Sequence, residues 1–145
     1  MGMAQNTRLV HATPEQVWNV LADGWLYPVW VVGASRMRDV DEAWPDVGSK
    51  LHHSVGLWPL LIDDNTEVVD ATLHHSMTLR ARAWPAGEAS VHLRLDAVGA
   101  ETSVTIEEEP VSGPGALVPP PVRGMGLRWR NSETLRRLAF IAEGR

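Results

Sequence analysis

The segment TPEQVWNVLADG, Thr13–Gly24, contains signals for both ends of one short helix. Thr13 can cap the helix, Pro14 has the fixed φ of a first helical position, and Gln16 stands where a capping box requires Glu or Gln. Gly24 marks the end of the helix. The segment therefore predicts an amphipathic helix that packs through one apolar stripe, made of Val17, Trp18 and Leu21.

The residues on either side of this helix predict a short strand and a broken aromatic segment. Arg8–His11 has the composition of a strand, and Trp25–Trp30 is too short and too proline-bound for a long helix. We therefore expect two short helices to follow the first strand.

From Ala34 onward the hydrophobic period changes to two, which predicts a meander of antiparallel strands. Short turns such as Pro45–Gly48 and Val98–Ala100 fit hairpins. The alternation within Met77–Trp84 gives one apolar and one polar face, as a sheet that is wet on one side requires. The expected strands are Ser35–Asp41, Ser49–Leu57, Ile62–Asp70, Met77–Trp84, Ser90–Val98 and Thr102–Glu109.

The C-terminal part predicts a loop followed by a long helix. Pro110–Pro121 holds five of the ten prolines and should end strand pairing, and Val122–Ala142 can form an amphipathic helix lying on the sheet. Its apolar or small face comprises Gly124, Leu127, Asn131, Leu135, Leu138 and Ala142. Its solvent face is expected to carry Arg130, Glu133, Arg136 and Arg137.

The composition limits the classes of function. The 145 residues suit one domain, residues 1–145, and a net charge of −5 disfavours binding to nucleic acid. The absence of cysteine excludes disulfides and thiol nucleophiles, and no apolar run is long enough to span a membrane. We expect a soluble, cytoplasmic protein, a monomer or homodimer, with no integral membrane association.

This order of elements resembles the START/polyketide-cyclase-like superfamily, also called SRPBCC or helix-grip. The resemblance covers about residues 7–142. It is carried by ATPEQVWNVLADGWLYPVW (Ala12–Trp30), DVGSKL (Asp46–Leu51), TSVTIEEEPVSGP (Thr102–Pro114) and RNSETLRRLA (Arg130–Ala139). It implies an α+β fold in which a curved antiparallel sheet wraps around a long C-terminal helix, with a ligand cavity between them. No catalytic motif is common to the superfamily, so none is transferred.

The duplicated tetrapeptide LHHS, at Leu51–Ser54 and Leu73–Ser76, raises the question of a metal site. Neighbouring strand residues point to opposite faces, so only His53 of the first pair can face inward. By alternation from Met77, His75 would share that face. Zinc would still need further ligands, with Glu108 the available candidate, so we predict no metal site and no cofactor.

Glu108 is the strongest candidate for chemistry, because alternation from Ile106 places it on the apolar face. It can act as a raised-pKa acid, or it can pair with an arginine of the C-terminal helix, for which Arg128 lies nearest the sheet-facing stripe. We hypothesise that the protein binds or carries a small hydrophobic or amphipathic ligand such as a lipid, polyketide or aromatic compound. The expected lining residues are Trp30, Met37, His53, Glu108, Met125 and Arg128.

Two alternatives stay open from the sequence. One is a cofactor-independent enzyme of the cyclase or dehydratase type, with Glu108 or His53 as general acid or base. The other is a protein-interaction domain that acts through the convex sheet or the arginine-bearing helix face.

Overall fold

The computed structural model describes residues 4–31, 34–55, 62–83, 87–112 and 120–144. At positions 4, 34–36, 55, 62–64, 83, 87, 110, 112 and 120–128 only the backbone is described. The elements are β1 (Ala4–Val10), α1 (Pro14–Ala22), a 3-10 turn η1 (Gly24–Leu26), α2 (Tyr27–Trp30), β2 (Ala34–Val40), β3 (Lys50–Val55), β4 (Ile62–Thr72), β5 (Ser76–Ala83), β6 (Gly87–Val98), β7 (Glu101–Ser112) and α3 (Pro120–Glu143).

The capping box predicted for α1 is confirmed. The Thr13 hydroxyl accepts a hydrogen bond from the Gln16 backbone N–H at 3.2 Å, and the Gln16 side-chain oxygen accepts one from the Thr13 N–H at 2.8 Å. These two bonds satisfy backbone donors that the first helical turn leaves open. The stripe faces the core as expected: Val17, Trp18 and Leu21 are buried.

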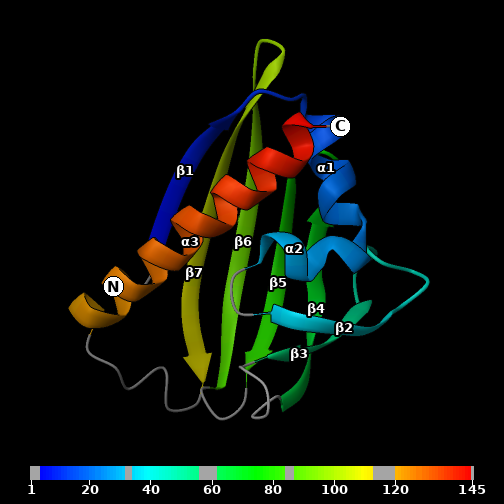
Figure 1. Cartoon of the computed structure of the whole chain (residues 1–145), viewed down its shortest axis with the longest axis vertical. Coiled ribbons are helices and arrows are strands. Elements are labelled where there is room, and N and C mark those ends of the chain that lie inside the picture. Colours follow the sequence, from blue (N-terminus) through cyan, green and yellow to red (C-terminus); the bar gives the residue numbers. More distant parts are fainter. Residues whose placement is uncertain (1–3, 32–33, 56–61, 84–86, 113–119, 145) are drawn as a thin grey trace.

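The strands form one antiparallel sheet in the order β1-β7-β6-β5-β4-β3-β2. Consecutive strands from β2 to β7 are neighbours, while β1 and β2 lie on opposite edges and are joined through α1, η1 and α2. Figure 1 shows the sheet curving behind α3, with α1 and α2 beside the C-terminal part of that helix. The predicted fold class, an α+β helix-grip fold, is confirmed.

The core lies between the concave face of the sheet and the helices. Met77 and Leu79 are buried while Arg80 and Arg82 are exposed, so the predicted two-sided pattern of β5 is confirmed. The sheet-facing stripe of α3 is likewise buried where its side chains are described, at Asn131, Leu135, Leu138 and Ala142. Burying one such leucine stabilises the fold by roughly 2 kcal/mol.

Gly24 allows a close approach of η1 to the first two strands of the meander. A Cβ at this position would lie 2.5 Å from Leu51 Cδ2 and 2.8 Å from Val40 Cγ1. Leu51 is fully buried, so it has no solvent-facing space to move into. The glycine predicted from the sequence as a helix stop therefore also allows η1 to pack closely on β2 and β3.

Several strand boundaries differ from the expected ones by one to four residues: β6, for example, begins at Gly87 and not at Ser90, and β4 ends at Thr72 and not at Asp70. The differences at β1 and β7 have a clear physical reason. β1 begins at Ala4 and ends at Val10, because it pairs with β7 along its whole length, from Ala4 opposite Glu108 to Val10 opposite Thr102. β7 continues past Pro110, which was expected to end the pairing. Pro110 lies beyond the last β1 pair that the structure describes; it pairs with Ala89 of β6, and the missing N–H is tolerated at a position without a second described neighbour.

Candidate functional site

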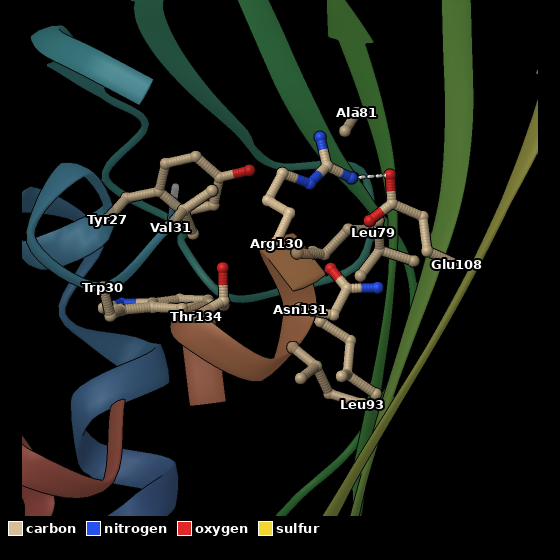
Figure 2. A pocket seen from close by; sticks show the side chains of 12 residues that line it. Tyr27, Trp30, Val31, Leu79, Ala81, Leu93, Glu108, Arg130, Asn131 and Thr134 are labelled. Carbon is tan, nitrogen blue, oxygen red and sulfur yellow. Dashed lines mark hydrogen bonds and ion pairs between the residues drawn. The ribbon is translucent and has the colours of Figure 1, made fainter. Parts of the chain in front are cut away.

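A cavity of about 70 Å³ lies between α2, α3 and strands β5 to β7. Figure 2 shows its side chains converging from the sheet and from both helices. The described apolar wall consists of Val31, Leu79, Ala81, Val91, Leu93 and Ile106. The aromatic and polar lining consists of Tyr27, Trp30, Glu108, Arg130, Asn131 and Thr134.

Strand register explains why a carboxylate faces this apolar wall. Leu79 lies opposite Val91, and Val91 lies opposite Glu108, so these three residues form one row across β5, β6 and β7. Glu108 is 6% exposed, and Glu109 is exposed on the other face. The predicted inward direction of Glu108 is confirmed.

Glu108 forms an ion pair with Arg130 of α3, as Figure 2 shows. The Glu108 side chain is 7% exposed and that of Arg130 is 36% exposed. The expectation that Arg130 belongs to the solvent face was therefore wrong. The arginine lies one residue before buried Asn131 and one turn before buried Thr134, on the flank of the helix that faces α2, and its long side chain reaches the carboxylate.

This pairing also corrects the expected arginine partner of Glu108. Arg128 was expected in that role, and the observed partner is Arg130. The side chains of Arg128 and Met125 lie outside the described part of the structure, although both residues belong to α3.

A buried polar chain adjoins the cavity behind Tyr27. His53 Nε2 is 2.7 Å from Thr66 Oγ1, and the Tyr27 hydroxyl is 3.2 Å from the same oxygen. The Tyr27 and His53 rings stack with centroids 5.4 Å apart. Burial raises the pKa of the Tyr27 hydroxyl above its ordinary value, while the hydrogen bond with Thr66 opposes that rise.

His53 is buried as predicted, but it is not among the described lining residues of the cavity. Of the three hydrogen-bonded residues His53, Thr66 and Tyr27, Tyr27 alone is among them. Met37 lies opposite His53 in the register of β2 and β3 and is half-buried; it too is not among the described lining residues. Trp30 lines the cavity and is 3% exposed, packed edge-on against Tyr27.

The hypothesis that His53 and His75 share the inner face was wrong for His75. That residue is exposed and follows His74, whose φ of 63° turns the chain between β4 and β5. Alternation along a strand does not extend through such a turn. His52 points away from His53 and bonds Asp41 at 3.0 Å, and the described residues contain no group of three or more possible metal ligands.

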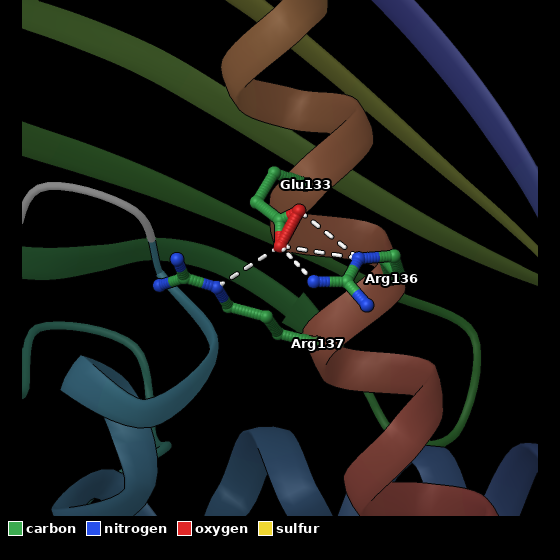
Figure 3. Close-up of polar contacts among 3 residues, drawn as sticks. All are labelled: Glu133, Arg136 and Arg137. Atoms are coloured by element: carbon green, nitrogen blue, oxygen red, sulfur yellow. Dashed lines mark hydrogen bonds and ion pairs between the residues drawn. The ribbon is translucent and has the colours of Figure 1, made fainter.

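The outer side of α3 carries a small ion-pair cluster. Glu133 accepts hydrogen bonds from Arg136 Nη2 at 2.5 Å and from Arg137 Nε at 3.4 Å (Figure 3). The Arg136 guanidinium, followed by that of Arg137, lowers the pKa of the Glu133 carboxyl. The pairs lie largely in solvent, so they contribute little to stability.

Within the described residues no helix is both long enough and apolar enough to cross a membrane.

The sequence interpretation missed Arg130, Asn131 and Thr134 as lining residues. A signal was present for Asn131, because it is the one amide in the stripe expected to face the sheet. Thr66 had no such signal, since threonine is common in strands.

A curved sheet closed over a long helix, with an apolar cavity and buried polar groups between them, defines a helix-grip protein. The family described as "Polyketide cyclase / dehydrase and lipid transport" matches residues 1–142, and the chain belongs to this family. The resemblance predicted from the sequence is thereby confirmed. A comparison with curated proteins gave no match.

Solved structures similar to this chain share the same fold. Protein NE0264 from Nitrosomonas europaea is 15% identical with a TM-score of 0.75, over 98% of this chain and 94% of that one. Ara h 8.0201 is 9% identical with a TM-score of 0.74, over 99% and 98%. The Zhui aromatase/cyclase from Streptomyces sp. R1128 is 18% identical with a TM-score of 0.67, over 97% and 93%.

Proposed function

We propose that the protein binds, and thereby carries or sequesters, a small hydrophobic or amphipathic molecule in the cavity between α3 and the sheet. The observation that supports this most is the lining itself. An apolar wall from three strands faces an ion pair between the buried Glu108 carboxylate and the partly exposed Arg130 guanidinium, so one end of the site is polar and the rest is apolar. This combination is typical of small-molecule sites.

The size of the cavity adds a requirement to this proposal. A volume of about 70 Å³ holds only a few water molecules, whereas ligand sites usually measure several hundred Å³. A lipid or polyketide therefore has to widen the site. Arg130 is the group best placed to move, because its side chain is 36% exposed and extends to Glu108 from the flank of α3.

Native mass spectrometry of protein purified from its own host tests this function, with a copurified small molecule as the expected result. The variant Ala81→Phe fills the cavity and should abolish copurification. Val69→Phe is the matched control, because Val69 lies on the neighbouring strand β4 with a 40% exposed side chain. Copurification that survives Ala81→Phe in a folded variant would contradict binding at this site.

A second candidate function is catalysis of the cyclase or dehydratase type without a cofactor. Its supporting observation is the series of hydrogen bonds from His53 through Thr66 to Tyr27, which lines the cavity. A proton can pass along this series through the two hydroxyl groups. The family description names cyclases and dehydrases, and one structure of similar fold is an aromatase/cyclase. Glu108 or His53 would serve as general acid or base.

The variant Glu108→Gln separates the two functions once a ligand is known. Unchanged affinity with lost turnover supports catalysis by Glu108, and the absence of turnover in the wild-type protein supports carriage.

We further propose that the protein acts as a single domain in the cytoplasm, as a monomer or homodimer, without nucleic acid or integral membrane association. Fractionation and size-exclusion chromatography test these points.

A further inference from the structure

A second hollow lies on the outer surface of the protein, between α2 and the C-terminal part of α3. We call it the α2–α3 groove; its volume is about 270 Å³. Figure 1 shows the two helices side by side. The described residues that line the groove are Val29 of α2 and Arg136, Arg137, Phe140 and Ile141 of α3. None of these five residues is among the described lining of the interior cavity, so the groove is a separate site.

The apolar part of the groove is largely open to water. Phe140 is 81% exposed and Val29 is 53% exposed, while Ile141 is half-buried against the core. Residues four positions apart on a helix lie on the same face, so Phe140 adjoins Arg136, and Ile141 adjoins Arg137. An apolar group placed in the groove would remove this surface from water, which favours binding.

The two arginines of the groove share one carboxylate unequally. Arg136 donates to Glu133 from Nε at 3.0 Å and from Nη2 at 2.5 Å. Arg137 reaches the same carboxylate through Nε alone, at 3.4 Å. Its two Nη groups make no hydrogen bond within the described structure, and Figure 3 shows them on the side away from Glu133. Arg137 therefore keeps donors available for a ligand.

The charges around the groove favour a ligand with a single negative charge. Two arginines against one glutamate leave one positive charge in excess, and the described lining contains no carboxylate. The two Nη groups of a guanidinium fit the two oxygens of a carboxylate. A phosphate carries nearly two negative charges, which exceeds the excess positive charge and would bring repulsion from Glu133.

Size and charge argue against a larger occupant. A stable protein interface buries about 800 Å² on each partner, whereas five described residues line the groove. In a symmetric dimer formed through this surface, the same patch of both copies would meet. Arg136 and Arg137 of the two copies would then repel each other. A small molecule avoids both difficulties.

We propose that the α2–α3 groove binds a small monocarboxylate with an apolar body. Its carboxylate accepts hydrogen bonds from Arg137, and its apolar body lies against Val29 and Phe140. This site goes beyond the function proposed for the interior cavity, because it lies on the outer surface and takes an anion.

The test compares three probes that separate the charge from the apolar body. 2-Naphthoate carries both, 2-naphthamide replaces the carboxylate by a neutral amide, and acetate lacks the apolar body. Each is titrated to millimolar concentration into the ¹⁵N-labelled protein, and the amide signals of Val29 and Phe140 are followed by NMR. We expect 2-naphthoate to bind about fivefold more tightly than 2-naphthamide, and acetate to bind more weakly than either.

Two pairs of variants at exposed positions assign the roles of the side chains. Arg137→Gln should weaken 2-naphthoate about fivefold and leave 2-naphthamide unchanged, because it removes only the charge. Arg94→Gln is the matched control, since Arg94 is an exposed arginine of β6 paired with Asp96. Phe140→Ala should weaken both naphthyl probes. Leu73→Ala is its control, because Leu73 is 63% exposed in the turn between β4 and β5.

Equal affinity for 2-naphthoate and 2-naphthamide, or an equal loss in Arg137→Gln and Arg94→Gln, would overturn carboxylate recognition by the groove. Signal changes confined to Leu79 and Leu93 of the interior cavity would overturn the groove site and leave the cavity function standing. Anionic lipid vesicles and size-exclusion chromatography test the other occupants. Vesicle binding or dimer formation that depends on Phe140, without saturable binding of 2-naphthoate, would also overturn the proposal.

Discussion

Removal of Arg130 should destabilise the protein more than removal of its partner does. In Arg130→Met the Glu108 carboxylate stays 7% exposed and loses its one described hydrogen-bond partner. In Glu108→Gln, by contrast, Arg130 keeps access to water through its 36% exposed side chain. The asymmetry in burial therefore predicts an asymmetry in the free energy of unfolding.

The magnitude follows from the burial of the two partners. Breaking a fully buried pair costs about 3–5 kcal/mol, and breaking an exposed one costs about 0.2–1 kcal/mol. This pair is buried on one side and half-exposed on the other, so Arg130→Met should lose about 2 kcal/mol. Glu108→Gln should lose about 1 kcal/mol or less. The double variant should be more stable than Arg130→Met alone, because it leaves no unpaired charge.

Urea unfolding at neutral pH, followed by tryptophan fluorescence, measures all four proteins of this double-mutant cycle. The comparison requires equal m-values, so that the change lies in stability and not in the compactness of the unfolded chain. Equal losses for the two single variants would contradict the predicted asymmetry, and strict additivity in the double variant would show that the ion pair does not couple Glu108 to α3.

Two further perturbations test other parts of the fold. Gly24→Ala should destabilise by about 1–3 kcal/mol in the same assay, because its Cβ would lie 2.5 Å from buried Leu51; an unchanged midpoint would contradict the close approach. The pKa of His11 should lie above its ordinary value of 6.5, because Glu101 bonds its ring, so its contribution to stability is present at low pH and is lost as pH rises through the raised pKa. An NMR titration of His11 should show this shift in the wild-type protein and its loss in Glu101→Gln, and identical titrations of the two proteins would contradict it.

Local signals in the sequence predicted the elements and the direction of most strand residues. The capping box at Thr13 and the alternation around Ile106 depend on neighbours within a few positions, and both are confirmed. The same alternation placed His53 and Glu108 inward correctly. These predictions succeeded because strand geometry alone fixes which face a residue occupies.

Features that depend on distant contacts were not predictable in this way. The choice of Arg130 over Arg128 depends on the rotation of α3 about its axis, where one residue corresponds to about 100°. The direction of His75 depends on the φ of His74 in the preceding turn. The absence of a described partner for Asn131 Nδ2 and Trp30 Nε1 became visible only when the partners of each buried atom were known.

The most direct test of the central claim is a crystal structure of the protein purified from its own host. We predict electron density for one small organic molecule between α3 and the sheet, in contact with Leu79 and Ile106. An interior filled by side chains, with any copurified molecule bound elsewhere on the surface, would contradict the claim.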